Sequence, residues 1–258
     1  MKLPFVKYHG TGNDFIIVNN LDGTISLTNH QIEALCHRRF GVGADGLMLI
    51  EKSQEAPFSM RYFNSDGNES TMCGNGGRCI SHYAANIKIV GKAISFMGID
   101  GIHHSELLND GRVKLKMKNV DSVSIKDGFT FLDTGSPHHV ILTTKVADIN
   151  VYSEGKSVRN SPNYPQGTNV DFVERRSPDQ LFVRTYERGV EDETWSCGTG
   201  VVASAIANFA NGNPSTHYQI ETLGGNLEVT FNHQKGTFFD VFLTGPVKFV
   251  FEGSLELN

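Results

Sequence analysis

The stretch Met72-Cys73-Gly74-Asn75-Gly76-Gly77-Arg78-Cys79 places a cysteine directly before glycines and an asparagine. An apolar-periodic run over residues 80–87 follows it and closes at Gly91. This pattern predicts a thiol at a helix N-terminus, where free N–H groups gather and the helix dipole favours negative charge. Such a position lowers the pKa of a thiol from about 8.5 towards roughly 3.5–7.5. For a single cysteine beside a tight turn, simple packing is the more common role.

The same arrangement occurs a second time in the chain. Cys197-Gly198-Thr199-Gly200 follows Cys73-Gly74-Asn75-Gly76 at a shift of 124 residues, close to half of the 258-residue length. Flanking matches keep the same order at nearly the same shift: Gly10 with Gly135, Glu51 with Glu174, Arg61 with Arg184, and Gly111 with Gly236. Because several weak matches at one offset indicate a repeat, we infer an internal duplication.

Each half of the duplication is predicted to hold several strands, many in hairpins, and one prominent helix. The helix expected over residues 201–210 has only Ser204 and Asn208 as polar residues, so the strands of its own half should enclose it. Another helix is expected over residues 28–39, with Thr28 as N-cap and Cys36 in the core. The predicted fold class is α+β: two pseudo-symmetric lobes, each a mixed, largely antiparallel β-sheet or barrel around a central helix. The lobes should span residues 1–118 and 119–248.

Composition excludes several classes of protein. With 39% hydrophobic and 20% charged residues the chain is typical of globular proteins, and a net charge of -5 leaves no basic surface for nucleic acid. No apolar run is long enough to cross a membrane, and the N-terminus lacks a signal-peptide core. The four cysteines form no CxxC pair. We therefore expect a cytoplasmic protein with free thiols, and neither nucleic-acid nor membrane partners.

Cysteines in duplicated positions suggest one class of reaction. If the lobes pack about a pseudo-twofold axis, Cys73 and Cys197 flank a bound molecule from opposite sides. A thiolate can then remove a proton from a carbon while a thiol returns one to the other face, which inverts the stereocentre. The amides at the two helix starts would hold a substrate carboxylate and stabilise the developing carbanion.

Other motifs carry weaker hypotheses. The segment Gly41-Val42-Gly43-Ala44-Asp45-Gly46 matches GxGxxG, but it follows a predicted helix and precedes a strand, the reverse of the dinucleotide-binding order. The pairs His103-His104 and His138-His139 lack an HExxH motif or paired acidic ligands, so no metal site is expected. Trp195 is interpreted as a packing residue.

The chain resembles the diaminopimelate epimerase family over essentially its whole length. The residues that carry the resemblance are Gly10-Thr11-Gly12-Asn13-Asp14-Phe15, Gly41 to Gly46, Asn64-Ser65-Asp66-Gly67, Met72 to Cys79, Pro137-His138, Asn169-Val170-Asp171-Phe172-Val173, Glu187-Arg188-Gly189 and Cys197 to Gly200. The combination of Cys-Gly-Asn-Gly-x-Arg-Cys with Glu-Arg-Gly…Cys-Gly-[Ser/Thr]-Gly is highly specific. The resemblance implies an enzyme that uses no cofactor and interconverts LL- and meso-diaminopimelate in lysine and peptidoglycan biosynthesis.

The resemblance also implies roles for individual residues. Cys73 and Cys197 match the catalytic acid/base cysteines, and His138 and Glu187 match groups that modulate the cysteine pKa values. The positions that match substrate-binding residues are Asn13, Asn64, Gly74, Asn75, Asn169, Glu187, Arg188, Gly198 and Thr199. Family members are commonly homodimers, and their C-terminal segment, here about residues 249–258, returns to the first lobe.

Two positions depart from the family pattern, and they leave alternatives open. Many members have Gln where this chain has Gly46, and Asn where it has Ser136. Both positions match substrate-contacting residues of the family, so a water or a neighbouring side chain fills the space, or the substrate differs. The alternatives are a racemase or epimerase of another amino acid, such as proline or histidine, and a non-catalytic amino-acid-binding protein or thiol redox protein. The duplicated thiols argue against simple binding, and the missing CxxC argues against redox chemistry.

Overall fold

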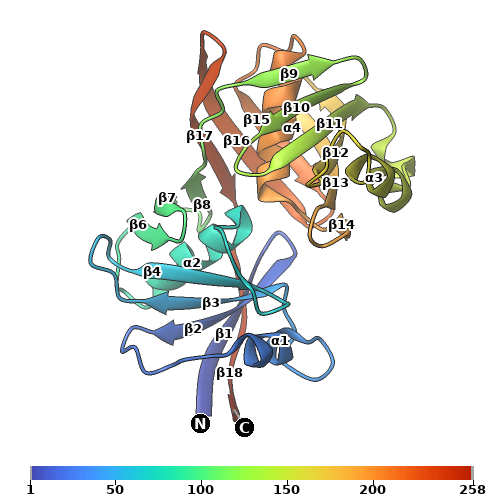
Figure 1. Cartoon of the computed structure of the whole chain (residues 1–258). Helices are drawn as coiled ribbons and strands as arrows, with labels where there is room; N and C mark the ends of the chain where they lie inside the picture. The colour runs from blue at the N-terminus through green and yellow to red at the C-terminus, as the bar shows by residue number, and fades with distance from the viewer. Residues whose placement is uncertain (1, 257–258) are drawn as a thin grey trace. The chain divides into compact units, whose positions relative to one another are not determined.

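The computed structural model describes residues 2–256, which form two compact units. The first lobe consists of residues 2–115 together with 246–256, and the second lobe of Lys116–Gly245. The sequence prediction places these boundaries after residues 118 and 248. Figure 1 labels the helices and strands of both lobes.

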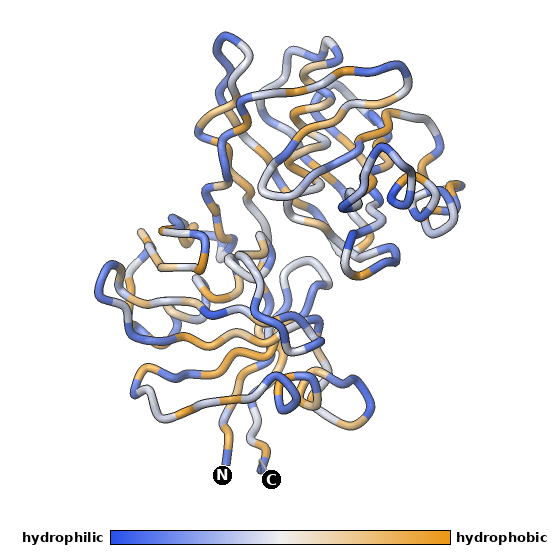
Figure 2. The backbone as a smooth tube through the Cα atoms, viewed as in Figure 1, coloured by the Kyte–Doolittle hydropathy of each residue, from blue (hydrophilic) through white to orange (hydrophobic). Residues whose placement is uncertain are grey.

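The first lobe is a mixed sheet with two helices. Its strands are β1 (Lys2–Gly10), β2 (Asn13–Asn20), β3 (Gly46–Glu51), β4 (Ser59–Asn64), β5 (Glu69–Ser70), β6 (Ala93–Gly98), β7 (Gly101–Leu107), β8 (Val113–Lys116) and β18 (Lys248–Glu256). Its helices are α1 (Asn29–Cys36) and α2 (Gly74–Asn86). Helix α2 packs against β1, β2, β3 and β7. Figure 2 shows hydrophobic residues along β2 and β3, whose central positions are buried.

The second lobe repeats this plan. Its strands are β9 (Val123–Lys126), β10 (Phe129–Asp133), β11 (Pro137–Thr143), β12 (Asn169–Ser177), β13 (Gln180–Glu187), β14 (Asp192–Thr194), β15 (His217–Thr222), β16 (Gly225–Gln234) and β17 (Thr237–Gly245). Its helices are the 3-10 turn η1 (Val146–Asp148), α3 (Val151–Arg159) and α4 (Gly198–Ala210). Helix α4 packs against β9–β13, β16 and β17, which surround it in Figure 1.

Strand pairing confirms the predicted duplication. In the first lobe β2 and β3 are parallel and are joined through α1, and β11 and β12 of the second lobe are parallel and joined through α3. The pairs β4–β6 and β13–β15 are also parallel, and they are joined through α2 and α4. Parallel neighbours need a crossover connection, so each helix occurs where the sheet requires one. The other pairings are antiparallel, as expected for a largely antiparallel sheet.

Helix α4 confirms the expectation of an enclosed apolar helix. Ten of its thirteen residues are buried, including Ser204 and Asn208, whereas the third polar residue, Thr199 in the first turn, is half-buried. The Ser204 hydroxyl donates to the Gly200 carbonyl at 2.7 Å, and the Asn208 amide oxygen accepts from the Arg175 guanidinium at 2.8 Å. The Ser204 hydroxyl and the Asn208 amide oxygen thus have hydrogen-bond partners inside the apolar core.

Helix α1 begins as the sequence predicts. Thr28 is its N-cap, and a capping box joins the side chain and backbone of Thr28 to those of Gln31. Cys36 is buried in a core cluster with Ile32 and Leu35. The helix ends before the glycine-rich segment that leads into β3, which confirms that this segment does not stand in a dinucleotide-binding context.

Strand β18 completes the first lobe from the far end of the chain. It pairs antiparallel with β1, from Lys2 opposite Glu256 to His9 opposite Lys248, with one irregularity near Lys7. In the second lobe β9 pairs in the same way with β10, which is the counterpart of β1. The duplicated sheets therefore share one pairing order but recruit their outer strand from different places in the sequence.

Helix α3 supplies a test of packing in the second lobe. A Cβ at the buried Gly155 would lie 2.3 Å from Cβ of Tyr186, a fully buried residue that has no space to move. Gly155→Ala should therefore lower the free energy of unfolding by about 1–3 kcal/mol. Gly91→Ala is the matched control, since no atom lies within 4 Å of its added Cβ. Urea denaturation of both variants measures the difference, and equal stabilities would contradict this packing.

Candidate active site

Both predicted cysteines stand at the start of an enclosed helix. Cys73 is the N-cap of α2 and Cys197 the N-cap of α4, each with extended backbone angles, and each helix has thirteen residues. The carbonyls of Cys73 and Cys197 accept the first helical bonds, from Gly77 N at 2.7 Å and from Val201 N at 3.0 Å. Neither side chain makes a capping bond. The thiols therefore lie where first-turn amides and the helix dipole favour an anion.

In the first lobe two asparagines accompany the thiol. The Cys73 thiol donates to Oδ1 of Asn13, with the sulfur 3.5 Å from the oxygen. Nδ2 of Asn75 donates to the same oxygen at 3.2 Å. Asn13 is the first residue of β2 and Asn75 lies in the first turn of α2. The structure thus brings three of the sequence-predicted site residues together.

Two further predicted residues of the first lobe lie at the ends of neighbouring strands. Gly46 begins β3 and Asn64 ends β4, and they are directly opposite each other. Asn64 is exposed, whereas Gly46 is buried. A Cβ at Gly46 would lie 2.6 Å from Cε2 of Tyr62 and 2.5 Å from the Phe63 carbonyl oxygen. The Tyr62 ring thus occupies the space next to Gly46, so a larger side chain does not fit there.

In the second lobe a polar chain leads away from Cys197. The Cys197 sulfur lies 3.5 Å from Oγ1 of Thr199, and that oxygen lies 3.0 Å from Nε2 of His138. Nδ1 of His138 lies 2.7 Å from Oδ2 of Asp171. The imidazole and the carboxylate are fully buried, and Thr185 donates to the other carboxylate oxygen at 2.7 Å. Such a chain orients the imidazole and connects the thiol to a buried acid.

The surroundings of Cys197 favour its protonated form, so the lowered pKa expected of a thiol at a helix start is not found at this cysteine. Burial raises the pKa of the Cys197 thiol well above its usual range, and the carboxylates of Glu187 and Asp171 raise it further. A hydrogen bond from Thr199 acts in the opposite direction but is smaller. Cys197 is therefore suited to hold a proton until a substrate changes its environment.

The remaining predicted residues of the second lobe form a connected group. Nδ2 of Asn169 donates to Oγ of Ser136 at 2.9 Å, and its Oδ1 accepts from the backbone N of Arg188 at 2.9 Å. The Arg188 guanidinium donates to the Gln166 carbonyl at 3.3 Å. Glu187 accepts from the Thr194 hydroxyl at 3.0 Å. Asn169 thus links the strand ends that carry Ser136 and Arg188.

Sequence reasoning missed Asp171 and misjudged Trp195. Asp171 is the one charged residue inside the otherwise apolar run Val170–Val173. Because strand interiors rarely bury an unpaired acid, this carboxylate could have been recognised from the sequence as a candidate site residue. Trp195 is 63% exposed, so the interpretation as a packing residue is wrong. Its neighbour Ser196 is buried instead.

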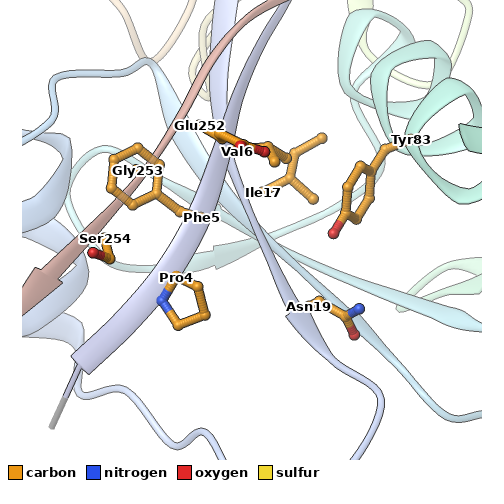
Figure 3. Close-up of a pocket in the computed structure, with 9 residues that line it drawn as sticks. All are labelled: Pro4, Phe5, Val6, Ile17, Asn19, Tyr83, Glu252, Gly253 and Ser254. Atoms are coloured by element: carbon orange, nitrogen blue, oxygen red, sulfur yellow. The ribbon is translucent and has the colours of Figure 1, made fainter. Parts of the chain in front are cut away.

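A separate hollow of about 470 Å³ lies in the first lobe, away from the residues above. It is lined by Pro4, Phe5, Val6, Ile17, Asn19, Tyr83, Glu252, Gly253 and Ser254 (Figure 3). None of the sequence-predicted site residues lines it. Within residues 2–256 no three His, Cys, Asp or Glu side chains are grouped to hold a metal ion, and no helix has the length and apolar content to span a membrane.

The two helix starts allow a matched test of the polar chain. A Cβ at Gly200 would lie 2.4 Å from Oδ1 of Asp171, so Gly200→Ala should displace the carboxylate that holds His138. We expect a loss of about 1–3 kcal/mol in the free energy of unfolding. At the equivalent Gly76 a Cβ would lie 3.4 Å from Sδ of Met48, an ordinary contact. Gly76→Ala should be the milder change in thermal or urea denaturation, and the reverse order would refute this geometry.

Comparisons with known proteins agree with this architecture. The family model described as diaminopimelate epimerase matches residues 5–123 and 130–250. A diaminopimelate epimerase of Flavobacterium psychrophilum is 49% identical over 98% of this chain and 100% of its own, and one of Chlorobaculum tepidum is 40% identical over 96% and 99%.

Solved structures share the fold at low identity. A phenazine biosynthesis protein of the PhzF family from Bacillus anthracis has a TM-score of 0.74 at 14% identity, with both chains fully covered. A hydroxyproline epimerase from Agrobacterium vitis has a TM-score of 0.70 at 12% identity, covering 98% of this chain and 92% of that one. The two-lobed sheet with a helix in each lobe is therefore a known architecture. By sequence, the chain belongs to the diaminopimelate epimerase family.

Proposed function

We propose that this protein is an epimerase that interconverts LL- and meso-diaminopimelate without a cofactor. The observation that carries the proposal is the placement of Cys73 and Cys197 at equivalent helix starts, in two lobes whose strands pair in the same order. The family membership supports the substrate, since the relatives compared above carry that name. A thiol pair without CxxC spacing is better suited to proton transfer than to disulfide exchange.

The proposed reaction uses the two cysteines as acid and base on opposite faces of one α-carbon. The thiolate of one cysteine takes the α-proton, and the thiol of the other donates its proton to the opposite face of the carbanion. First-turn amides of α2 and α4 stabilise the negative charge that spreads onto the substrate carboxylate. The raised pKa of Cys197 suits it to start one direction of the reaction as the acid.

We assign the other site residues by their surroundings in each lobe. His138 and Glu187 adjust the proton affinity of Cys197, through Thr199 and through charge. Substrate binding is proposed for the following residues: Asn13, Asn64, Gly74, Asn75, Asn169, Glu187, Arg188, Gly198 and Thr199. A zwitterionic far end of the substrate would meet both charges of the Glu187-Arg188 pair.

The two departures from the family pattern fit the same substrate. Tyr62 takes the space beside Gly46, so a neighbour, not a water, replaces the missing side chain. Ser136 reaches Asn169 through its hydroxyl at 2.9 Å. Side chains with hydrogen-bonding groups therefore lie beside both positions: Tyr62 beside Gly46, and Asn169 beside Ser136.

We further propose that two copies of the chain pair through β18. Among the described residues β18 pairs only with β1, so its other edge is open. Phe249, Val250 and Phe251 are 45%, 48% and 43% exposed, which is unusual for a row of large apolar side chains. The hollow described above lies beside this strand and β1. A symmetric partner would cover the apolar row, since a twofold interface uses the same patch on both copies.

The cytoplasm is the proposed compartment. Among the described residues none of the four cysteines forms a disulfide: Cys36, Cys73, Cys79 and Cys197. The proposed mechanism needs two of them reduced, and reducing conditions are typical of the cytoplasm.

The enzyme proposal is tested by proton exchange in heavy water. Reduced protein with LL-diaminopimelate should give deuterium at the α-carbon and inversion to the meso form, measured by mass spectrometry and chiral chromatography. Cys73→Ala and Cys197→Ala should each lower the rate at least about a hundredfold, because each removes an acid/base group. Cys36→Ala, at a buried core cysteine, is the matched control. Proline and histidine are run in parallel, and exchange with one of them alone would replace the proposed substrate.

The dimer proposal is tested by molar mass in solution. Val250→Glu places a charge in the exposed row of β18 and should convert the dimer to a monomer in sedimentation or light-scattering measurements, since burying an unpaired charge is costly. Ile125→Glu is the control, an equally exposed apolar residue on β9. A wild-type protein that is monomeric at micromolar concentration would refute the proposal.

A further inference from the structure

Arg78 is a buried cation in the first lobe. It lies in α2, one turn after Cys73, and its side chain is fully buried. Its guanidinium donates to the Gly74 carbonyl at 3.2 Å, to the Thr11 hydroxyl at 3.4 Å and to Oδ1 of Asn75 at 2.9 Å. All three acceptors are neutral. Burying a charge without a direct counter-ion is costly, so its position calls for an explanation.

Asp45 lies at the other end of the same group of side chains. Its Oδ2 accepts from Nδ2 of Asn13 at 2.7 Å and from the backbone N of Asp14 at 3.1 Å. Its Oδ1 pairs with the Arg38 guanidinium at 2.7 Å. The carboxylate thus holds the amide group of Asn13 from the side opposite to Cys73.

Two amides connect these charges, and all the bonds run in one direction. Arg78 donates to Asn75, Asn75 donates to Asn13 at 3.2 Å, and Asn13 donates to Asp45. Turning either amide over would point an NH2 group at the guanidinium or an oxygen at the carboxylate. The charges at the two ends therefore fix the orientation of both amides.

We propose that Arg78 and Asp45 are positioning residues, which act on the reaction at Cys73 through Asn75 and Asn13 without touching the substrate. The fixed orientation keeps Oδ1 of Asn13 as the acceptor for the Cys73 thiol, 3.5 Å away, and keeps Nδ2 of Asn75 as a donor. The catalytic part of this inference rests on the proposed function. The orientation of the amides does not.

We call the hydrogen-bonded series Arg78, Asn75, Asn13 and Asp45 the amide bridge. The second lobe has no equivalent of this amide bridge. At the shift of 124 residues that relates the two cysteines, Arg78 corresponds to Val202, a buried apolar residue. Cys197 instead has His138 and Asp171 behind it. The amide bridge is therefore specific to the helix start of Cys73.

Other charged and titratable groups near the amide bridge determine which control variants are suitable. On β2, Asp14 pairs with Lys7 at 2.7 Å and with Arg38 at 2.7 Å. Burial acts to raise the pKa of Asp14, but hydrogen bonds from Arg38 and Lys7 outweigh it and lower that pKa to about 2. On α2, burial raises the pKa of Cys79 beyond the physiological range. Asp14 is therefore a charged neighbour whose side chain bonds to neither asparagine.

The first experiment separates Arg78 from a merely structural residue. Arg78→Met removes the donor to Asn75 and keeps most of the volume, and we expect kcat/KM for diaminopimelate to fall about a hundredfold, as for a misplaced catalytic constellation. Arg78→Lys keeps a positive charge at this position, three residues after Asn75, and should restore most of the lost kcat/KM. Arg112→Lys, at a half-buried surface arginine that pairs with Asp110, is the matched control. Activity of Arg78→Met within twofold of wild type, or no recovery in Arg78→Lys, would overturn the proposal.

The second experiment reads the thiol directly and needs no substrate. Asp45→Asn frees the Asn13 amide to turn, and alkylation of Cys73 by iodoacetamide at pH 7 should become roughly threefold faster, since the neutral thiol loses its acceptor. Asp14→Asn removes a charge that contacts the backbone N of Asp45 at 3.1 Å and Arg38 at 2.7 Å but neither asparagine, so it should change the rate less. Peptide mass spectrometry follows Cys73, with Cys197 as the internal reference.

The outcomes separate this inference from the proposed function. Equal acceleration in Asp14→Asn and Asp45→Asn would reduce the effect to simple charge and overturn the bridge. Equal acceleration of Cys73 and Cys197 would indicate general loosening and overturn it as well. If wild-type protein fails to epimerise diaminopimelate while Asp45→Asn still accelerates Cys73 selectively, the proposed function fails and the bridge stands.

Discussion

Burial of one helix inside each lobe is the constraint on which the rest of the structure depends. An enclosed helix has its first-turn amides fixed by the surrounding strands, so their direction is set by the fold and not by the substrate. Cys73 and Cys197 stand at these helix starts but do not cap them. Each helix therefore keeps donors for an anion beside a thiol, and glycines at the first turn allow neighbouring strands to approach closely.

The duplicated lobes differ in the charges that lie behind these thiols. Next to Gly200 of the second lobe the structure places the buried Asp171, which holds His138. Next to the equivalent Gly76 it places Met48 and Phe15, which are apolar. The first lobe has its buried guanidinium elsewhere, at Arg78. The fold is thus nearly symmetric while the electrostatics of the two thiols are not, which matters for the proposed reaction, in which one thiol gives a proton and the other takes it.

Much of this arrangement was predictable from sequence because it depends on glycine and cysteine at fixed spacing. The repeat at 124 residues identified two lobes and two helix starts, and Thr28 identified the beginning of α1. The contacts that depend on strand register were not predictable. The contact of Asp171 with His138 joins residues 33 apart on parallel strands, and the filling of space at Gly46 by Tyr62 requires knowing which face of β4 points inward.

Side-chain orientation was the other property that could not be predicted from the sequence. A sequence gives Arg78, Asn75 and Asn13 as separate residues, and their order in a chain of hydrogen bonds appears only when α2 and β2 are placed together. The solvent exposure of a single side chain, such as Trp195, could not be predicted either. Patterns of spacing predict elements well, but they carry little information on which way one polar group faces.

The pairing of β1 with β18 has a consequence for how the chain folds. The second lobe is built from one continuous segment, so every strand it needs is present once Gly245 has been synthesised. The first lobe closes over almost the full length of the chain, since Lys2 pairs with Glu256, and such distant contacts form slowly. During synthesis the lobe that begins first is thus the lobe that finishes last, with the edge of β1 left open until the final strand arrives.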